Sequence, residues 1–427
     1  MRNRRNTRKR NVVISTITNR NFIIIVSVLL VLILISFGII KIRNYLDERT
    51  MARQAEELAK QTGEIFTAVE NNLSSETKNE DEQETNVQSA NISAVGDILC
   101  QMDMIEDAYD NNTYNFTHMF AEITKFIENA DLTIGTMETN FIDNEFSGVG
   151  KYNSPIEFLT ATKNSGVNLV SVAHNHELDY GIDGLNTTVQ KIQDAGLSVT
   201  GLKNNTENEN KEFTGLIKDV NGIKIAFLGY TYGLSNEQEL SDEEKSMANI
   251  YTEELAKKDI EYAKENSNFI IVMMHWGNVN ESTVSDEQNS IANFLIQNGV
   301  DIILGSHPSV VEPMKIVQNE EGKNILVAYS LGNYISSLKY EDANLELVLN
   351  IEIAKTTDSD KAILQRVDYT PIYMLDNGEG AENRFQLIDM KQVATDYASG
   401  NRDRISRATY DDIIEKLEKL RVLLNAK

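Results

Sequence analysis

The chain is 427 residues long and has 40 lysine and arginine residues against 65 aspartate and glutamate residues, a formal net charge of -25. Because 41% of its residues are apolar, it can build a large core, which excludes a wholly disordered chain and suggests one large domain or two ordinary ones. The single Cys100 excludes a disulfide framework and multi-cysteine zinc or iron–sulfur sites. The acid excess argues against nucleic-acid partners, since a negative surface repels phosphate backbones.

The N-terminal segment has the opposite charge. Residues 1–43 contain nine basic residues and no acid, and they enclose an apolar, uncharged run of 19 residues from Phe22 to Ile40. A helix of that length spans roughly 28 Å, close to the hydrocarbon thickness of a bilayer. No small-x-small cleavage site follows, so an uncleaved transmembrane helix over 22–40 is favoured over a signal peptide. Seven basic residues precede the run, which predicts a cytoplasmic tail over 1–21 and an extracellular location for the rest of the chain.

Residues 41–90 are predicted to connect this anchor to a folded body. Residues 44–70 have the pattern of a polar, solvated stalk helix with a weak apolar face. Residues 71–90 contain one leucine, one valine and no aromatic residue, a composition typical of a disordered tether.

From residue 91 onwards, short apolar runs alternate with helical patterns, which indicates an α/β fold. The predicted strands are rich in valine, isoleucine and leucine, as in strands buried on both faces. They are 92–98, 132–137, 167–173, 223–229, 269–274, 300–304, 325–329, 345–353 and 364–369. The predicted helices are 116–129, 185–195, 253–264, 287–297 and, at the end of the chain, about 405–425.

One pair of strands is predicted to be antiparallel. Asn221-Gly222 separates the runs 215–220 and 223–229, and this dipeptide is the strongest short signal for a hairpin. We therefore expect a mixed β-sheet core flanked by helices in a body over 91–372, followed by a C-terminal helical extension over 373–427.

Polar side chains of metal-ligand type follow five of the predicted strands. In α/β sheets, the loops at the carboxyl ends of the strands meet at one crevice. Carboxylate and imidazole ligands suit manganese, iron or zinc, and an asparagine carbonyl can join them. The predicted metal ligands are Asp97, Glu138, Asn175, His176, His275 and His307.

Six strings stand out in this region. They are GDI at 96–98, DLTIGTMET at 131–139, HNHELDYGIDG at 174–184, HWG at 275–277, GVDIILGSHPSVVEP at 299–313 and YSLGNY at 329–334. Together they resemble the CapA family of capsule and poly-gamma-glutamate synthesis proteins. The resemblance covers roughly 91–371 and implies a calcineurin-like metallophosphatase fold, a membrane anchor and one or two divalent ions. It also implies that Asp97, Asn175, His176 and His275 serve catalysis, and that an anionic cell-surface polymer or its synthase complex is the partner.

The chain departs from the family pattern at the candidate site. Thr136 stands where the family usually has asparagine, and His174 stands where it has the first asparagine of Asn-Asn-His. Val279 replaces a glutamate after HWG, and Ser309 replaces the second histidine of the GxHPH string. The centre is therefore expected to be thinner than usual, with His174 as an extra imidazole that could partly compensate.

Three functions stay open from the sequence. The first is a metal-dependent enzyme that hydrolyses or transfers at a phosphate- or amide-like centre of a cell-envelope substrate. The second is a non-catalytic subunit that binds or guides an anionic polymer, which the departures at Val279 and Ser309 favour. The third is a general ecto-phosphoesterase. A simpler interpretation of Asn175 and His176 is also open, namely that they only stabilise a tight turn into Asp179.

Overall fold

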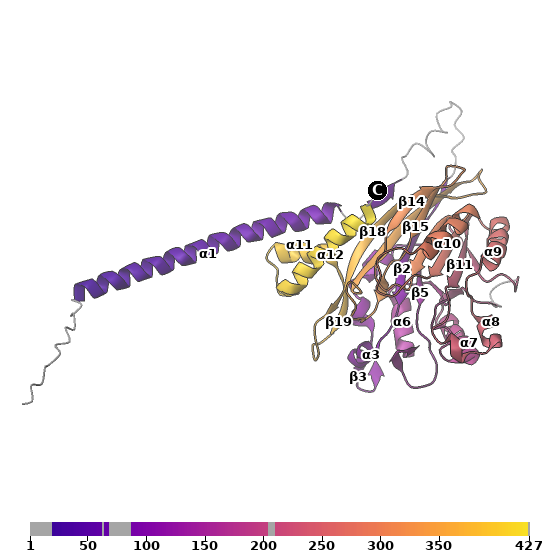
Figure 1. The fold of residues 1–427 in the computed structure, drawn as a ribbon, viewed down its shortest axis with the longest axis horizontal. Coiled ribbons are helices and arrows are strands. Elements are labelled where there is room, and N and C mark those ends of the chain that lie inside the picture. The colour runs from indigo at the N-terminus through magenta and orange to yellow at the C-terminus, as the bar shows by residue number, and fades with distance from the viewer. Residues whose placement is uncertain (1–18, 62–63, 68–86, 204–209, 426–427) are drawn as a thin grey trace, which may run out of the picture.

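The computed structural model describes residues 19–61, 64–67, 87–203 and 210–425. Helix α1 (Asn19–Gln61) extends away from an α/β body (Figure 1). Its segment Val26–Arg43 has a mean hydropathy of 2.4 and none of it is buried. Within the described ranges it is the one helix long and apolar enough to cross a membrane, which indicates a membrane anchor.

The polar half of α1 is not the solvated stalk that the sequence predicts. Ala55 is only 1% exposed and belongs, with the partly buried Met51, to the same apolar cluster as α11 (Met390–Ala398) and α12 (Arg407–Asn425). The hydroxyl of Tyr410 donates a hydrogen bond to the backbone oxygen of Met51 at 3.4 Å. The weak apolar face of α1 is therefore a docking face for the C-terminal helices.

Two predictions for this region are wrong. The helix predicted up to residue 70 gives way to a strand at 64–67, and the disordered tether predicted up to residue 90 gives way to a strand from residue 87. Strand β1 (Glu64–Thr67) pairs with β18 (Ile363–Asp376). Strand β2 (Val87–Ile98) begins at Val87, whose partner in β17 (Leu345–Thr356) is Thr356. In both cases the unpaired edge of an existing strand supplies backbone hydrogen bonds that local composition cannot reveal. The remainder of the predicted tether, 71–86, lies outside the described residues.

Among the described residues, the strands form two mixed sheets. The first sheet has the order β1-β18-β17-β2-β5-β8-β9, with β16 beside β2 and β19 beside β18. Its further strands are β2 (Val87–Ile98), β5 (Leu132–Met137), β8 (Leu169–Ser171), β9 (Ser198–Thr200), β16 (Asn333–Ile335), β17 (Leu345–Thr356), β18 (Ile363–Asp376) and β19 (Phe385–Asp389). The mixed sheet core flanked by helices is confirmed, although its strands are divided between two sheets.

The second sheet has the order β10-β11-β12-β13-β15-β14. Its strands are β10 (Leu216–Val220), β11 (Ile223–Thr231), β12 (Phe269–His275), β13 (Ile302–Ser306), β14 (Met314–Gln318) and β15 (Asn324–Ala328). The predicted hairpin is confirmed, because Val220 pairs with Ile223 and both Asn221 (φ 54) and Gly222 (φ 83) have the left-handed backbone that a two-residue turn needs. Two short ribbons complete the strands, β3 (Tyr109–Asp110) with β4 (Thr113–Tyr114) and β6 (Ser147–Val149) with β7 (Lys151–Asn153).

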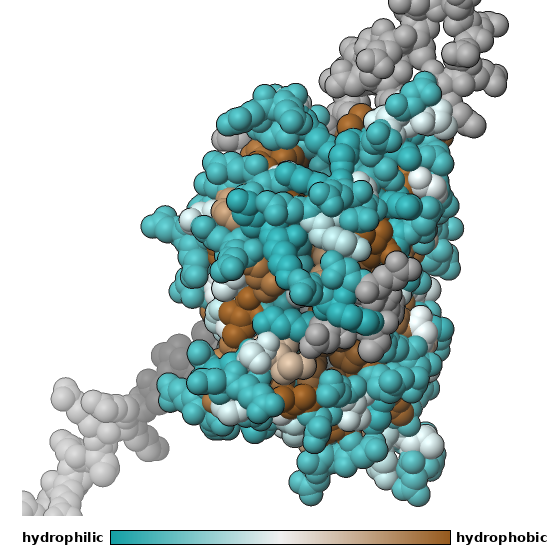
Figure 2. All heavy atoms as spheres, turned by 90° about the vertical axis from the view of Figure 1, so that its right-hand side faces the viewer, coloured by the Kyte–Doolittle hydropathy of each residue, from teal (hydrophilic) through white to brown (hydrophobic). Residues whose placement is uncertain are grey.

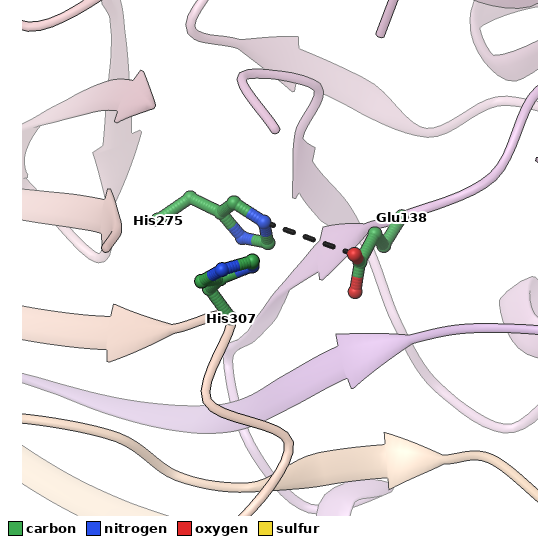
Figure 3. Close-up of side chains that lie close together, drawn as sticks. All are labelled: Glu138, His275 and His307. Carbon is green, nitrogen blue, oxygen red and sulfur yellow. Dashed lines mark ion pairs between the residues drawn. The ribbon is translucent and has the colours of Figure 1, made fainter. Parts of the chain in front are cut away.

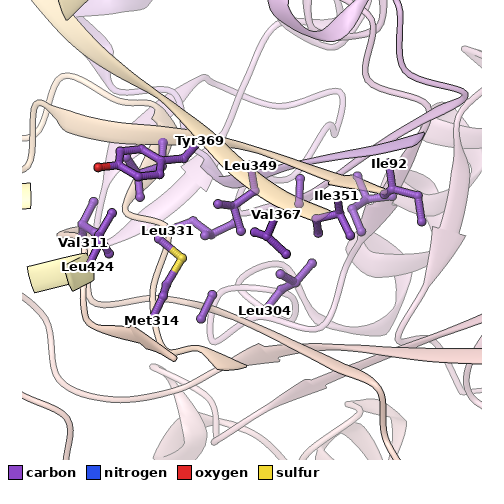
Figure 4. Packing of buried hydrophobic residues seen from close by; sticks show 14 of the residues in the cluster. Ile92, Leu304, Val311, Met314, Leu331, Leu349, Ile351, Val367, Tyr369 and Leu424 are labelled. Atoms are coloured by element: carbon purple, nitrogen blue, oxygen red, sulfur yellow. The ribbon is translucent and has the colours of Figure 1, made fainter. Parts of the chain in front are cut away.

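The two sheets pack face to face over a shared apolar core. Ile92 and Leu349 of the first sheet and Ile271 of the second belong to one buried cluster, part of which is drawn in Figure 4. The outer face of the second sheet packs against α9 (Glu253–Asn266) and α10 (Asp286–Gln297). The outer face of the first sheet packs against α3 (Met102–Ala108), α4 (Thr117–Phe120), α5 (Thr124–Ile127), α6 (Ile156–Asn164) and α7 (Gly181–Asp194). The face turned away from α1 is mostly hydrophilic (Figure 2), in line with the acid excess.

Two further expectations need correction. The helix predicted over 116–129 is broken into α4 and α5, because backbone bonds from Met119 to Phe116 and from Ile123 to Phe120 tighten the chain and turn its apolar residues to the sheet. The segment 373–427 is not only helical, since β18 continues to Asp376 and pairs with β19. The short helix α8 (Asp242–Met247) and a 3-10 turn (Glu237–Glu239) lie between β11 and α9.

Candidate metal centre

The six predicted ligands lie at the carboxyl ends of strands from both sheets. Strands β2, β5 and β8 run parallel in the first sheet, and β11, β12, β13 and β15 run parallel in the second. Their carboxyl ends therefore share one edge of the double layer. Asp97 is the penultimate residue of β2, Glu138 follows β5, Asn175 and His176 follow β8, His275 ends β12 and His307 follows β13.

Three of these side chains form a close, buried group. One ligand atom each from Glu138, His275 and His307 lies within 4.8 Å of the others (Figure 3). Nε2 of His275 is 3.8 Å from Oε1 of Glu138, and the ring centroids of His275 and His307 are 4.7 Å apart. The side chains come from three strands that are distant in sequence, so only the fold brings them together.

Two more predicted ligands border this group. Asp97 accepts a hydrogen bond from the backbone N–H of His307 through Oδ2 at 2.7 Å, and its Oδ1 is 3.5 Å from Nδ1 of His275. Oδ1 of Asn175 is 2.8 Å from Nε2 of His275, and its amide nitrogen donates to Ser235 at 2.5 Å. Five of the six predicted residues therefore lie around one point.

Several polar atoms of this group lack a hydrogen-bond partner among the described residues. They are Oδ1 of Asp97, Oε2 of Glu138 and Nδ1 of His307, and all three are buried. A buried polar atom without a hydrogen bond costs about 1–3 kcal/mol, more if it is charged, so three such atoms in one place need a compensating partner. Carboxylate oxygens and an imidazole nitrogen are ligands for a divalent cation, and this donor set fits one.

The electrostatics of the group favour a cation too. Burial, together with the charges of Asp97 and Asp179, raises the pKa of the Glu138 carboxyl well above its usual value. Burial, together with His275 and His176, holds the pKa of His307 well below its usual value, which keeps this imidazole neutral and able to ligate. A bound cation would offset the cost of burying the Glu138 charge, and the neutral imidazole of His307 could serve as one of its ligands.

The backbone around the ligands requires glycine at two positions. A Cβ on Gly96 would lie 1.9 Å from the backbone oxygen of Gly332, and a Cβ on Gly305 would lie 1.7 Å from that of Tyr329. These close approaches bring β16 against β2 and the end of β15 against β13. His307 has a φ of 97°, a positive value that is uncommon for a residue with a side chain and that the surrounding structure must hold in place.

His176 and His174 lie beside the close group. Nδ1 of His176 is 3.0 Å from Asp179, and its ring meets the ring of Tyr152 edge-on at 4.6 Å. The interpretation that His176 only stabilises a turn accounts for its contact with Asp179. It does not account for Asn175, whose side chain contacts His275. His174 is buried, accepts from the backbone N–H of His176 at 3.1 Å, and has its ring 6.2 Å from that of His275. Burial, followed by His275 and His176, lowers the pKa of His174 well below its usual value.

Val279 and Ser309, which stand where the family pattern has a glutamate and a second histidine, contribute no charged group. Val279 is 45% exposed, in the loop after β12. Ser309 is buried with a φ of 60°, and its hydroxyl lies 3.4 Å from the backbone oxygen of His307, to which it donates. Neither residue replaces the carboxylate or imidazole that the family pattern would supply.

Sequence reasoning missed the residues that hold the ligands in place. The hydroxyl of Ser306 is 2.9 Å from Nδ1 of His275 and 3.3 Å from that of Thr136, so it fixes the orientation of the imidazole. Asp179 fixes His176 and also accepts from the backbone N–H of Tyr152 at 3.0 Å. Ser306 was hidden because only the pairing of β12 with β13 places it opposite His275.

Comparison with known proteins finds matches among bacterial capsule and PGA synthesis proteins. Residues 91–338 match the family model described as bacterial capsule synthesis protein PGA_cap. The capsule biosynthesis protein CapA of Bacillus anthracis is 26% identical over 252 residues, which cover 56% of this chain and 58% of that protein. The PGA biosynthesis protein CapA of Bacillus subtilis (strain 168) is 27% identical over 179 residues, which cover 42% and 45%. The chain thus spans about half the length of these curated relatives.

Solved structures show only a distant similarity. The Haemophilus influenzae NAD nucleotidase aligns with a TM-score of 0.44 at 16% identity, over 79% of this chain and 60% of that one. A putative 5'-nucleotidase from Staphylococcus aureus aligns with a TM-score of 0.43 at 13% identity, over 73% and 58%. At these scores nothing about the activity of the present chain follows from them.

Proposed function

Since the chain belongs to the bacterial capsule synthesis protein family, we propose that it is a membrane-anchored protein of capsule or poly-gamma-glutamate biosynthesis with a divalent metal centre. Its N-terminus would lie in the cytoplasm and its α/β body outside the cell. The basic residues before the apolar segment of α1 support this orientation. Its partner would be an anionic cell-surface polymer or the membrane complex that makes it.

The observation that carries the proposal is the group of buried, unpartnered ligand atoms on Asp97, Glu138 and His307 around His275. Together with Asn175 and His176, these residues would hold one or two ions of manganese, iron or zinc. His176 fits this role because Asp179 engages Nδ1, which leaves Nε2 as the nitrogen that can face an ion. Such an ion would supply Lewis-acid activation of water and of a phosphoryl or acyl oxygen of a cell-envelope substrate.

The side chains themselves would have distinct tasks in such a reaction. Ser306 keeps the His275 ring in one orientation, and Asn175 lies between His275 and Ser235 with its amide oxygen toward the centre. The burial of the group excludes bulk water and strengthens every charge interaction within it. This arrangement supports metal-dependent hydrolysis or transfer.

Metal analysis of the full-length protein in detergent tests the proposal. We expect one or two equivalents of a divalent transition metal in the wild-type protein and a loss of most of it in the Asp97→Ala and His275→Ala variants. The matched control is His118→Ala, because His118 pairs with Asp107 at 3.0 Å and is none of the proposed ligands. Retention of the metal in both ligand variants would contradict the proposed centre.

A second candidate function is a non-catalytic subunit that binds or guides the polymer. The missing family ligands at Val279 and Ser309 favour it. A strongly acidic body would repel an anionic polymer unless metal ions bridge the two, so binding should require divalent ions. Polymer binding that persists in chelator would exclude this bridging mechanism.

A further inference from the structure

Aromatic side chains flank the candidate metal centre on two sides. The ring centroid of Tyr232, which follows β11, is 4.8 Å from that of His307, with the two planes tilted by 44°. On the other side, Tyr152 of β7 meets the ring of His176 edge-on at 4.6 Å.

One more apolar side chain extends this border outward. Val279 is 45% exposed, and the next residue donates its backbone N–H to the oxygen of Pro308 at 2.8 Å. Its loop therefore lies against the loop that carries His307. We call Tyr152, Tyr232 and Val279 the apolar rim.

Backbone hydrogen bonds fix the positions of Tyr232 and Tyr152, the two rim residues whose rings contact candidate ligands. The N–H of Tyr232 donates to the backbone oxygen of His275 at 2.9 Å. Tyr152 donates its N–H to Asp179, and its carbonyl accepts from the side chain of Asn140 at 3.1 Å. Tyr232 is nevertheless 43% exposed. A tyrosine side chain has only two rotatable bonds, so on a backbone that is fixed in this way it can contact a ligand face with little loss of entropy.

The net charge decides what kind of ligand these rings suit. A body with so many acids repels a linear polyanion unless metal ions bridge the two, so net charge gives the rings themselves no preference for such a chain. Stacking on an uncharged ring does not depend on net charge, and the phenol hydroxyls can add hydrogen bonds to ring substituents.

We propose that the apolar rim is a stacking subsite for a substrate in which a ring, either a sugar or a nucleobase, is carried close to the phosphoryl group presented to the metal centre. The inference rests on the proposed function and adds to it the chemical class of the substrate. Tyr232, which lies beside His307, is the main specificity-determining residue, and Tyr152, which lies beside His176, forms the opposite side.

Equilibrium titration of the manganese-loaded, full-length protein with phenylphosphonate and methylphosphonate tests this subsite. Both probes lack an ester bond, so the readout is binding and not turnover. Because an aromatic contact contributes about 0.5–1.5 kcal/mol, we expect the phenyl probe to bind about 2- to 12-fold more tightly. Tyr232→Leu should remove this preference while the metal content and the affinity for methylphosphonate stay unchanged, and Tyr232→Phe should keep it.

The matched control is Tyr109→Leu, because Tyr109 is also half exposed but lies in the β3–β4 ribbon against Tyr114. Displacement of phenylphosphonate by glucose 1-phosphate or by adenosine 5'-monophosphate would support the subsite and identify the ring as a sugar or a base; displacement by neither would overturn it. An unchanged phenyl preference in Tyr232→Leu would overturn the subsite and leave the metal centre standing. If neither phosphonate binds to the metal-loaded protein, the phosphoryl chemistry of the proposed function fails together with the subsite.

Discussion

Replacing Glu138 by glutamine should change the stability of the protein in opposite directions with and without metal. Glu138 is 5% exposed, its Oε2 has no partner among the described residues, and the Asp97 carboxylate lies nearby. In the metal-free protein, folding must either bury this charge or protonate it. Glutamine keeps the size and removes that cost, so we expect the chelated variant to be about 1–3 kcal/mol more stable than the chelated wild type.

With metal, the order should reverse. At a free metal concentration of about 1,000 times Kd, binding stabilises the wild-type protein by about 4 kcal/mol. For a folded body of roughly 330 residues, 1 kcal/mol corresponds to about 1.5 °C in Tm, which predicts a rise of about 6 °C. The variant lacks one anionic ligand and should show only a small part of that rise.

Calorimetric melting of the wild type and Glu138→Gln, each in chelator and in manganese, measures both effects. The control is Glu265→Gln, an exposed residue near the end of α9, which should melt like the wild type under both conditions. An equal metal-induced rise of Tm in wild type and Glu138→Gln would refute the assignment of Glu138 as a ligand. A chelated variant no more stable than the wild type would refute the argument from buried charge.

Three further substitutions test other parts of the structure. Glu346 of β17 is fully buried, both of its oxygens lack a partner in the described part of the chain, and burial raises its pKa well above the usual value. The folded state then binds this proton more tightly than the unfolded state, so stability falls by up to about 1.4 kcal/mol per pH unit once the pH rises above about 4.3, the unfolded value. Glu346→Leu should remove this loss, and urea unfolding at pH 5 and pH 8 would contradict the reasoning if the wild type and the variant had the same slope. Gly305→Ala should cost about 1–3 kcal/mol in urea unfolding, since its Cβ would overlap the backbone oxygen of Tyr329; a neutral result would mean that β13 and β15 can separate freely. Ala55→Glu should place an unpaired charge against α11 and α12 at a cost of about 3 kcal/mol and expose the C-terminal helices to limited proteolysis, whereas an unchanged cleavage pattern would show that α1 does not dock there.

Much of the fold could be predicted from the sequence because its signals are local. The apolar run of α1, the valine- and isoleucine-rich strands and the Asn221-Gly222 hairpin each depend on a few neighbouring residues. The candidate ligands could be predicted for a related reason. Side chains that follow parallel strands must meet at one edge of the sheet, whatever the details of packing. His275 and His307 lie together because they stand at the carboxyl ends of the parallel neighbours β12 and β13.

Only the tertiary structure decided the features that depend on pairing between distant segments. The separation into two sheets, the edge strand at 64–67, the start of β2 at 87–90 and the docking of Ala55 come from backbone hydrogen bonds and burial that no local pattern contains. The same holds for Ser306 behind His275 and for Tyr232 over His307. The sequence by itself determined which residue types were available for a metal centre, whereas long-range packing decided which atoms were left buried without a partner and which rings border them.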